Sequence, residues 1–142
     1  MKLDQGPLEM QITELVISNP VKRKILLIED DEDIAKVLSY RLIKSDFYVF
    51  VAADGEKGLA EARREGPDLV ILDLGLPKLS GTEVCRAIRE DHDKKFSRTP
   101  IIMLTAKAQD VDRVIGKVLG ANSYMIKPFN AEALLNEINK FL

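Results

Sequence analysis

Short apolar runs alternate with amphipathic patterns five times from about Lys24 onward. Runs of strand length are predicted near residues 24–29, 47–52, 68–73, 100–105 and 123–127. Apolar residues at three- and four-residue spacing predict helices near 32–44, 55–65, 81–92, 110–119 and 130–141. Continuous apolar runs are typical of strands buried on both faces, and their alternation with helices favours a parallel sheet with right-handed crossovers.

Turn and capping residues agree with these limits. Asp54-Gly55 precedes the second predicted helix, Gly66-Pro67 closes it, and Ser80-Gly81 opens the third. Gly120 follows the fourth helix at the position of a C-cap. The second strand is rich in aromatic and β-branched residues, which suits an outer position of the sheet. The run before Asp73 is the most continuously apolar and is expected to be central.

The first residues of the chain follow a different pattern. We predict an N-terminal extension over 1–21 and one domain over 22–142. The extension is interpreted as a short amphipathic helix docked on the domain, as a disordered arm, or in part as a cloning remnant. Its apolar residues recur at helical spacing between Gly6-Pro7 and Asn19-Pro20: Leu8, Ile12, Leu15 and Val16.

Composition narrows the class of protein. The chain has 142 residues, of which 46% are apolar and 31% charged, as in an ordinary globular domain. A net charge of -2 gives no basic surface for nucleic acid, so no direct nucleic-acid binding is expected. No apolar run approaches the roughly 20 residues of a membrane span, and no signal-peptide pattern is present, so a cytoplasmic location is expected. The single Cys85 is predicted to be core and the single His92 to be solvated surface.

Five polar residues stand where apolar runs end. Glu29 and Asp30 follow the first run, Asp73 ends the third, Thr105 ends the fourth, and Lys127 follows the fifth. In open α/β sheets the ligand site lies outside the carboxyl ends of the strands, so these side chains are expected to converge on one edge. An acidic pair, a lone aspartate, a hydroxyl and a lysine suit a phosphoryl group carried on Asp73, with a divalent cation held by the acids.

The acids define the expected cation. Glu29, Asp30 and Asp73 would repel one another, and oxygen ligands in a wet site favour Mg²⁺, with Mn²⁺ as the alternative ion. Asp31 is a weak third candidate from the first cluster. It and the two acids after it also stand at a helix start, where negative charge favours the helix dipole without any further function.

Each of the other residues also has an ordinary structural interpretation. Asp73 could cap a helix, but Ser80 is better placed to cap the third helix. Thr105 could be a strand residue with a hydroxyl satisfied by backbone, or a hydroxyl that binds a phosphoryl oxygen. Lys127 could be a surface lysine, or the partner of a phosphate or carboxylate. Their coincidence at one edge favours the functional interpretation.

Over residues 22–142 the chain resembles a response-regulator receiver domain of two-component signalling. The stretches that carry the resemblance are 25–32, 70–77, 80–81, 100–106 and 120–129. The resemblance implies a CheY-like (flavodoxin-like) α/β fold: a five-stranded parallel sheet in order 2-1-3-4-5 with five helices on both faces. It also implies a domain that is no enzyme beyond its own phosphorylation and dephosphorylation.

The same resemblance assigns roles to individual residues. It implies that Asp73 is the phosphoacceptor, that Glu29, Asp30 and the carbonyl of Gly75 join it in binding the metal, and that Lys127 pairs with the phosphoryl group.

The resemblance further implies that Thr105 and Tyr124 form the switch pair and that the bond before Pro128 is cis. It implies a histidine kinase or phosphotransfer protein as the phosphodonor and a downstream protein as the target. A homodimer through the fourth helix, fifth strand and fifth helix is a further expectation, and no membrane partner is expected.

Two positions depart from the commonest family pattern. Glu29 stands where aspartate is more usual, a variant that the family accepts. Gly75 offers no side chain beside the site, so freer water access is expected there, which Lys107 could partly reclose.

Two competing classes are weighed against this interpretation. Aspartyl-nucleophile phosphatases use similar residues, but they need an acid two residues after the nucleophile, where Gly75 stands. A pseudo-receiver that acts as a phosphorylation-independent interaction module is the main alternative, although no site residue is lost.

Overall fold

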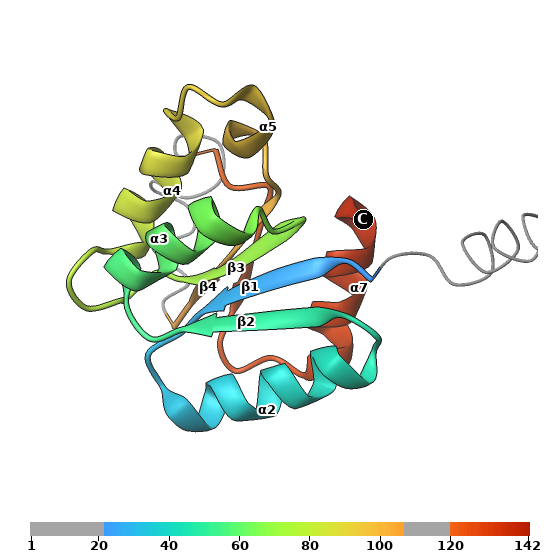
Figure 1. The fold of residues 1–142 in the computed structure, drawn as a ribbon. Helices are drawn as coiled ribbons and strands as arrows, with labels where there is room; N and C mark the ends of the chain where they lie inside the picture. The colour runs from blue at the N-terminus through green and yellow to red at the C-terminus, as the bar shows by residue number, and fades with distance from the viewer. Residues whose placement is uncertain (1–21, 107–119) are drawn as a thin grey trace, which may run out of the picture.

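The computed structural model describes residues 22–106 and 120–142 (Figure 1). Five strands form one sheet in the order β2-β1-β3-β4-β5, and every neighbouring pair is parallel. This confirms the predicted fold class. The strands are β1 (Lys24–Ile28), β2 (Tyr48–Ala52), β3 (Leu69–Asp73), β4 (Ile101–Thr105) and β5 (Ser123–Ile126). The predicted extension 1–21 and the predicted helix 110–119 lie outside the described residues.

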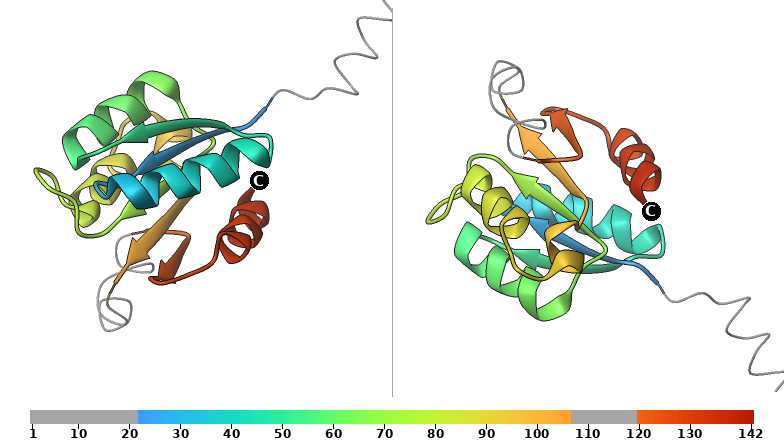
Figure 2. Two further views of the ribbon diagram at one scale, coloured as in Figure 1. Left: turned by 90° about the horizontal axis from the view of Figure 1, so that it is seen from below. Right: turned by 90° about the horizontal axis from the view of Figure 1, so that it is seen from above.

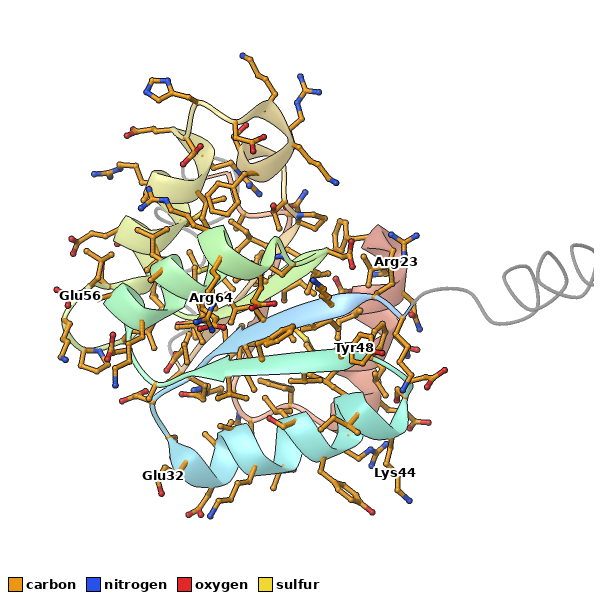
Figure 3. The ribbon with its side chains drawn as sticks, in the orientation of Figure 1. Arg23, Glu32, Lys44, Tyr48, Glu56 and Arg64 are labelled. Atoms are coloured by element: carbon orange, nitrogen blue, oxygen red, sulfur yellow. The ribbon has the colours of Figure 1, made fainter. Side chains whose placement is uncertain are left out.

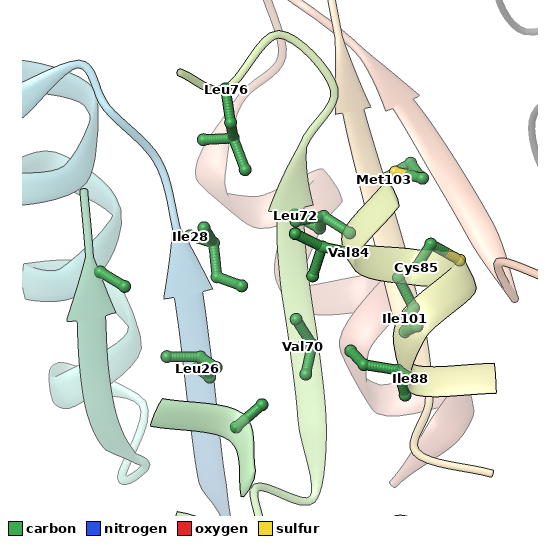
Figure 4. Packing of buried hydrophobic residues seen from close by; sticks show 12 residues of the cluster. Leu26, Ile28, Val70, Leu72, Leu76, Val84, Cys85, Ile88, Ile101 and Met103 are labelled. Atoms are coloured by element: carbon green, nitrogen blue, oxygen red, sulfur yellow. The ribbon is translucent and has the colours of Figure 1, made fainter. Parts of the chain in front are cut away.

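Helices cover both faces of the sheet, as Figures 1 and 2 show. On one face α3 (Gly55–Glu65) and α4 (Gly81–Arg89) pack against alternate strand residues; on the other lie α2 (Glu32–Lys44) and α7 (Ala131–Phe141). Figure 4 shows the first of these two clusters, in which Val70 and Leu72 of β3 face Val84 and Ile88 of α4. Every residue of β3 and β4 is buried, as expected for central strands covered on both faces.

The helix starts follow the predicted capping. The side chain of Asp54 accepts from the backbone N–H of Lys57, and Ser80 caps α4 in the same way. Gly66 closes α3 in the left-handed conformation, at φ 57°. The Asp54 and Ser80 caps fix where α3 and α4 leave the edge of the sheet that carries Asp73, and the Gly66 turn returns the chain at the opposite edge.

One helix differs from its prediction. The segment predicted as a single helix over 81–92 is α4, which ends at Arg89, followed by a separate four-residue helix, α5 (Lys94–Ser97). The physical reason is local competition by aspartates, because their side chains bond nearby backbone N–H groups instead of continuing a helix. Asp91 accepts from the N–H of Asp93, and Asp93 in turn caps α5.

Arg89 connects the segment after α5 to the residues that lead into β5 through hydrogen bonds. Its guanidinium donates to the carbonyls of Gly120, Ser97 and Thr99 at 2.7–2.9 Å, and to Asn122 Oδ1 at 2.9 Å. Burial lowers the pKa of this guanidinium, which nevertheless stays charged at neutral pH. Arg89 therefore sets how the chain enters β5, the strand that leads to Lys127.

Three further features lie where the sequence predicts them. β2 is an outer strand of the sheet, Cys85 is buried in the core, and His92 is exposed, all as predicted. Among the described helices, none has the length and apolar character required to cross a membrane.

Candidate functional site

The strand register brings the five polar residues to one edge of the sheet. Asp73 is the last residue of β3, next to Leu104 of β4. Ile28, the residue before Glu29, pairs with Leu72, the residue before Asp73. Thr105 pairs with Ile126, the residue before Lys127. Parallel strands in register thus end side by side, and the residues that follow them meet.

The acids and the lysine are in direct contact. Lys127 Nζ lies 2.8 Å from Glu29 Oε1 and 3.5 Å from Asp73 Oδ2. Carboxylate oxygens of Glu29, Asp30 and Asp73 all lie within 4.8 Å of one another. The Glu29 side chain is fully buried and that of Asp73 is 11% exposed, whereas Asp30 is exposed. The site therefore has a buried, charged floor and one open side.

Burial and charge shift the acid–base properties of this floor. Burial raises the pKa of Glu29 to about 7, with a further contribution from the neighbouring charge of Asp73 and an opposing one from the hydrogen bond of Lys127. The pKa of Lys127 is also raised: its burial would lower it, but the hydrogen bond to Glu29 and the charges of both acids outweigh this. The raised pKa of Glu29 indicates that Lys127 offsets only part of the free-energy cost of burying an ionised carboxylate. A second cation at the site would therefore stabilise the ionised form of Glu29.

Asp31 contributes differently from the other acids. Its Oδ1 accepts from the backbone N–H groups of Asp33 at 2.9 Å and Ile34 at 3.1 Å, so its carboxylate caps α2. Its own N–H donates to Glu29 Oε2 at 3.3 Å. The carboxylate group of three found among the described residues holds Glu29, Asp30 and Asp73 without Asp31. Asp31 therefore orients Glu29 through its backbone.

The backbone of Gly81 lies close to the backbone of Asp73, the candidate phosphoacceptor. A Cβ on Gly81 would lie 2.4 Å from the carbonyl oxygen of Asp73, and the N–H of Gly81 donates to Leu74 O at 3.1 Å. From the sequence, Gly81 is assigned to a helix start and to a stretch that carries the family resemblance, without a role beside Asp73. The signal that was available is the Ser-Gly dipeptide, which explains the cap but not the need for a missing side chain.

Gly75, in the same loop, has space for a side chain where Gly81 has none. A Cβ added there would meet nothing within 4 Å, and the N–H of Gly75 lies 3.4 Å from Asp73 Oδ1. We predict that Gly81→Ala lowers the free energy of unfolding by about 1–3 kcal/mol through overpacking, whereas Gly75→Ala changes it little. Urea unfolding of both variants measures the difference. Equal stabilities would contradict the close approach at Gly81.

The predicted switch residues occupy different environments. Thr105 is 2% exposed at the end of β4, whereas the Tyr124 ring on β5 is 45% exposed. The Lys127–Pro128 bond is cis, and the N–H of Lys127 donates to Thr105 O at 2.7 Å. Lys107 lies outside the described residues.

An apolar pocket opens beside the carboxylates. It has a volume of about 570 Å³ and lies between α2 and the segment that joins β5 to α7. Apart from Asp33 and Lys127, its lining is apolar: Ile34, Val37, Leu38, Pro128 and Phe129. The pocket meets the site at Lys127, which contacts Glu29 and Asp73, and its size and apolar lining suit a protein side chain or loop.

Comparison with known proteins gives this arrangement its class. The sequence profile of the response regulator receiver domain matches residues 25–139. The alkaline phosphatase synthesis transcriptional regulatory protein PhoP of Bacillus subtilis is 46% identical over 110 residues, 78% of this chain and 44% of PhoP. The sensory transduction protein RegX3 of Mycolicibacterium smegmatis is 42% identical over 118 residues, 83% of this chain and 50% of RegX3. The chain belongs to the response regulator receiver domain family.

Solved structures agree with the family. The chemotaxis response regulator CheY4 of Vibrio cholerae superposes with a TM-score of 0.78 at 33% identity, covering 86% of this chain and all of CheY4. The receiver domain of the sensor histidine kinase PA1611 of Pseudomonas aeruginosa has a TM-score of 0.77 at 32% identity, covering 85% of this chain and 98% of that one. That structure is described with a magnesium ion coordinated in its active-site cleft.

The family sets the general role. Receiver domains of two-component response regulators act as phosphoacceptors and are generally non-catalytic signalling modules, and magnesium binding is typical of them. The chain spans about half the length of the curated relatives it matches.

Proposed function

We propose that this chain accepts a phosphoryl group on Asp73 in a Mg²⁺-dependent reaction and passes the signal on through the surface around β5. The observation that carries the proposal is the contact of Lys127 with both Glu29 and Asp73, at 2.8 and 3.5 Å. This contact supports the proposal because it joins a lysine, a buried acid and the carboxylate that would act as nucleophile at the edge of the sheet where a phosphoryl group could be held.

The residues suit the chemistry of transfer. An oxygen of the Asp73 carboxylate would form a bond to phosphorus while the bond from phosphorus to the donor breaks, and its electron pair would leave with the donor. The donor is a phosphohistidine of a kinase or phosphotransfer protein, or a small acyl phosphate. Lys127 would pair with the negative charge of the transferred group, and the N–H of Gly75 points toward the same carboxylate.

Glu29, Asp30, Asp73 and the carbonyl of Gly75 are the groups that would hold Mg²⁺. Their oxygen chemistry fits this ion, and the buried charge of Glu29 is only partly offset by Lys127. When bound, the ion supplies charge neutralisation for the acids and the incoming phosphoryl oxygens.

A direct experiment tests the assignment. Purified protein is incubated with acetyl phosphate, with and without Mg²⁺, and its intact mass is measured alongside a receiver domain of known activity. We expect the mass of one added phosphoryl group only where Mg²⁺ is present. An unmodified protein under conditions that label the control would instead favour a phosphorylation-independent pseudo-receiver.

The pKa of Glu29 predicts a pH dependence for metal binding. Because its folded-state pKa is raised to about 7, Glu29 holds a proton below that pH, and the proton competes with the cation. The apparent Mg²⁺ affinity should therefore rise with pH and level off above about 7. Below that value it should weaken by up to about tenfold per pH unit. Isothermal titration at several pH values measures it; an affinity independent of pH from 5.5 to about 8 would contradict the prediction.

Glu29 also affects stability in the absence of metal. An acid whose folded pKa lies above its unfolded value contributes most below about 4.5 and loses that contribution as the pH rises to about 7. Added Mg²⁺ should therefore stabilise the fold more at pH 8 than at pH 6, since only the ionised acid binds the ion.

The switch is proposed at Thr105 and Tyr124. A phosphoryl group on Asp73 would draw the buried hydroxyl of Thr105, and the vacated space would admit the exposed Tyr124 ring. In Thr105→Ala, beryllofluoride with Mg²⁺ should still bind, but the Tyr124 ring signals in NMR should not move to a buried environment. Thr105→Ser keeps the hydroxyl and should retain the shift. A shift in Thr105→Ala equal to that of wild type would contradict the coupling.

The pocket beside the carboxylates supports a protein donor. Its apolar lining lies next to Lys127, so a donor domain seated there could bring a phosphohistidine to Asp73. The surface of β5 and α7 is proposed to bind the downstream partner or a second copy, and the helix predicted over 110–119, which lies outside the described residues, is the third part of that prediction. Tyr124 and Ile126 are its exposed apolar residues among those described on β5.

A further inference from the structure

An exposed apolar row runs along the outward side of α2. Val37, Tyr40 and Ile43 follow one another at three-residue spacing and are 57–61% exposed. We define these three residues as the outer row. The outward side of a surface helix is normally polar, so a row of three large apolar side chains is a candidate contact surface.

The neighbouring edge of the sheet extends this surface. Val51 of the outer strand β2 is 48% exposed and lines a groove of about 480 Å³ together with Tyr40 and Ile43. The outer row and Val51 thus form one apolar surface over α2 and β2. Cations lie on the same helix, at Lys36, Arg41 and Lys44, the last with its Nζ 5.4 Å from the Tyr40 ring centroid.

The described chain begins at one end of this surface. Lys22 Nζ pairs with Asp46 Oδ1 at 3.3 Å, and the N–H of Asp46 donates to the carbonyl of Ile43 at 3.0 Å. Figure 3 shows Lys44 and Arg23 at the same end of the molecule, where α2 ends and β1 begins. Lys22, the first described residue, therefore lies near the end of α2 that carries Ile43, the last residue of the outer row.

The sequence before Lys22 fits this surface in length and charge. Leu8, Ile12, Leu15 and Val16 recur at helical spacing. A helix over 8–16 would be about 14 Å long, and the outer row extends about 9 Å along α2. Residues 17–21 can span about 17 Å, enough to reach the surface from Lys22. Residues 8–18 carry two acids, Glu9 and Glu14, and no basic residue, which complements the cations of α2.

From this geometry we propose that residues 8–16 dock in cis on the outer row, alongside α2, and cover Ile43 and Tyr40. Leu15 and Val16 would meet Ile43, the end nearest the chain entry, and Leu8 would meet Val37. Val37 also lines the pocket beside Lys127, so the docked segment would share that residue with a protein donor. The contact does not require phosphorylation of Asp73, so it is tested in the unphosphorylated protein, independently of the function proposed above.

Amide hydrogen exchange of the full 142-residue chain tests the docking. Amides of residues 8–18 should exchange at least about tenfold more slowly than in an unfolded peptide of the same sequence. Ile12→Asp changes no residue of the two core clusters, and it should abolish this protection. Thr13→Asp, off the apolar face, should preserve it. On the domain side Ile43→Asp should abolish the protection, whereas Ile126→Asp at the opposite edge of the sheet should preserve it.

Three results would overturn the proposal. If the amides of residues 8–18 were unprotected in wild type, these residues would not dock, and the outer row would be a contact surface for another protein. Protection that grows with protein concentration would assign the row to a second copy. Protection that survives Ile43→Asp would place residues 8–16 elsewhere on the domain.

Discussion

Asp73→Asn is expected to abolish phosphorylation by acetyl phosphate and Mg²⁺ completely. The asparagine amide keeps the size of the side chain but lacks the nucleophilic carboxylate that ends β3. Burial is the main cause of the raised pKa of Glu29 and Asp73 adds to it, so the same substitution should lower that pKa only part of the way toward its usual value. Intact mass measures the first effect, and NMR titration of the Glu29 side chain measures the second.

Two neighbouring aspartates provide matched controls for this prediction. Asp31→Asn should be labelled like wild type, since asparagine caps α2 as well as aspartate does. Asp30→Asn should need more Mg²⁺ for the same labelling, because it removes one of three clustered carboxylates. Labelling that persists in Asp73→Asn but disappears in Asp31→Asn would move the phosphoacceptor away from β3.

Lys127→Met is expected to destabilise the metal-free protein and to tighten its binding of Mg²⁺. The methionine keeps an apolar stem but leaves Glu29 and Asp73 without the cation that now lies 2.8 and 3.5 Å from them. The loss should be about 1–3 kcal/mol in the free energy of unfolding. It should be smaller at pH 6, where Glu29 holds a proton, and larger at pH 8, since the pKa of Glu29 would rise further without Lys127.

Removing Lys127 should therefore lower the stability of the metal-free protein but increase its stabilisation by Mg²⁺. Once the pH is high enough to ionise Glu29 in the variant, the site without Lys127 has one more net negative charge, so Mg²⁺ should there raise the melting temperature of the variant more than that of wild type. Lys140→Met is the matched control, because Lys140 forms an exposed pair with Glu137 and should cost less than about 0.5 kcal/mol. If Mg²⁺ bound more weakly to Lys127→Met than to wild type, Lys127 would not be the competing cation.

The positions of the strands and of the site could be predicted because both depend on a simple rule. Buried parallel strands must be apolar on both faces, so a polar residue at the end of each run marks the edge of the sheet. Asp73 and Lys127 were found by that rule, and their predicted convergence is the observed contact. The order of the strands, by contrast, came from the family resemblance.

Other features depend on contacts that a single sequence does not reveal. The end of α4 at Arg89 depends on aspartate caps and on carbonyls that only the folded chain brings to the guanidinium. The requirement for glycine at 81 depends on the carbonyl of Asp73, eight residues earlier in the chain. The near-neutral pKa of Glu29 depends on how deeply the strand end is buried, which the sequence pattern does not measure.

The most direct test of phosphorylation at Asp73 is chemical mapping of the modified residue. Borohydride delivers a first hydride to the carbonyl carbon of an acyl phosphate, which expels phosphate and leaves an aldehyde. A second hydride and a proton from water reduce the aldehyde to an alcohol, so a phosphorylated aspartate becomes homoserine. After treatment with acetyl phosphate, Mg²⁺ and borohydride, peptide mass spectrometry should find homoserine at position 73 and unchanged residues at 29, 30 and 31. Reduction at any of those three acids, with position 73 intact, would contradict the proposed phosphoacceptor.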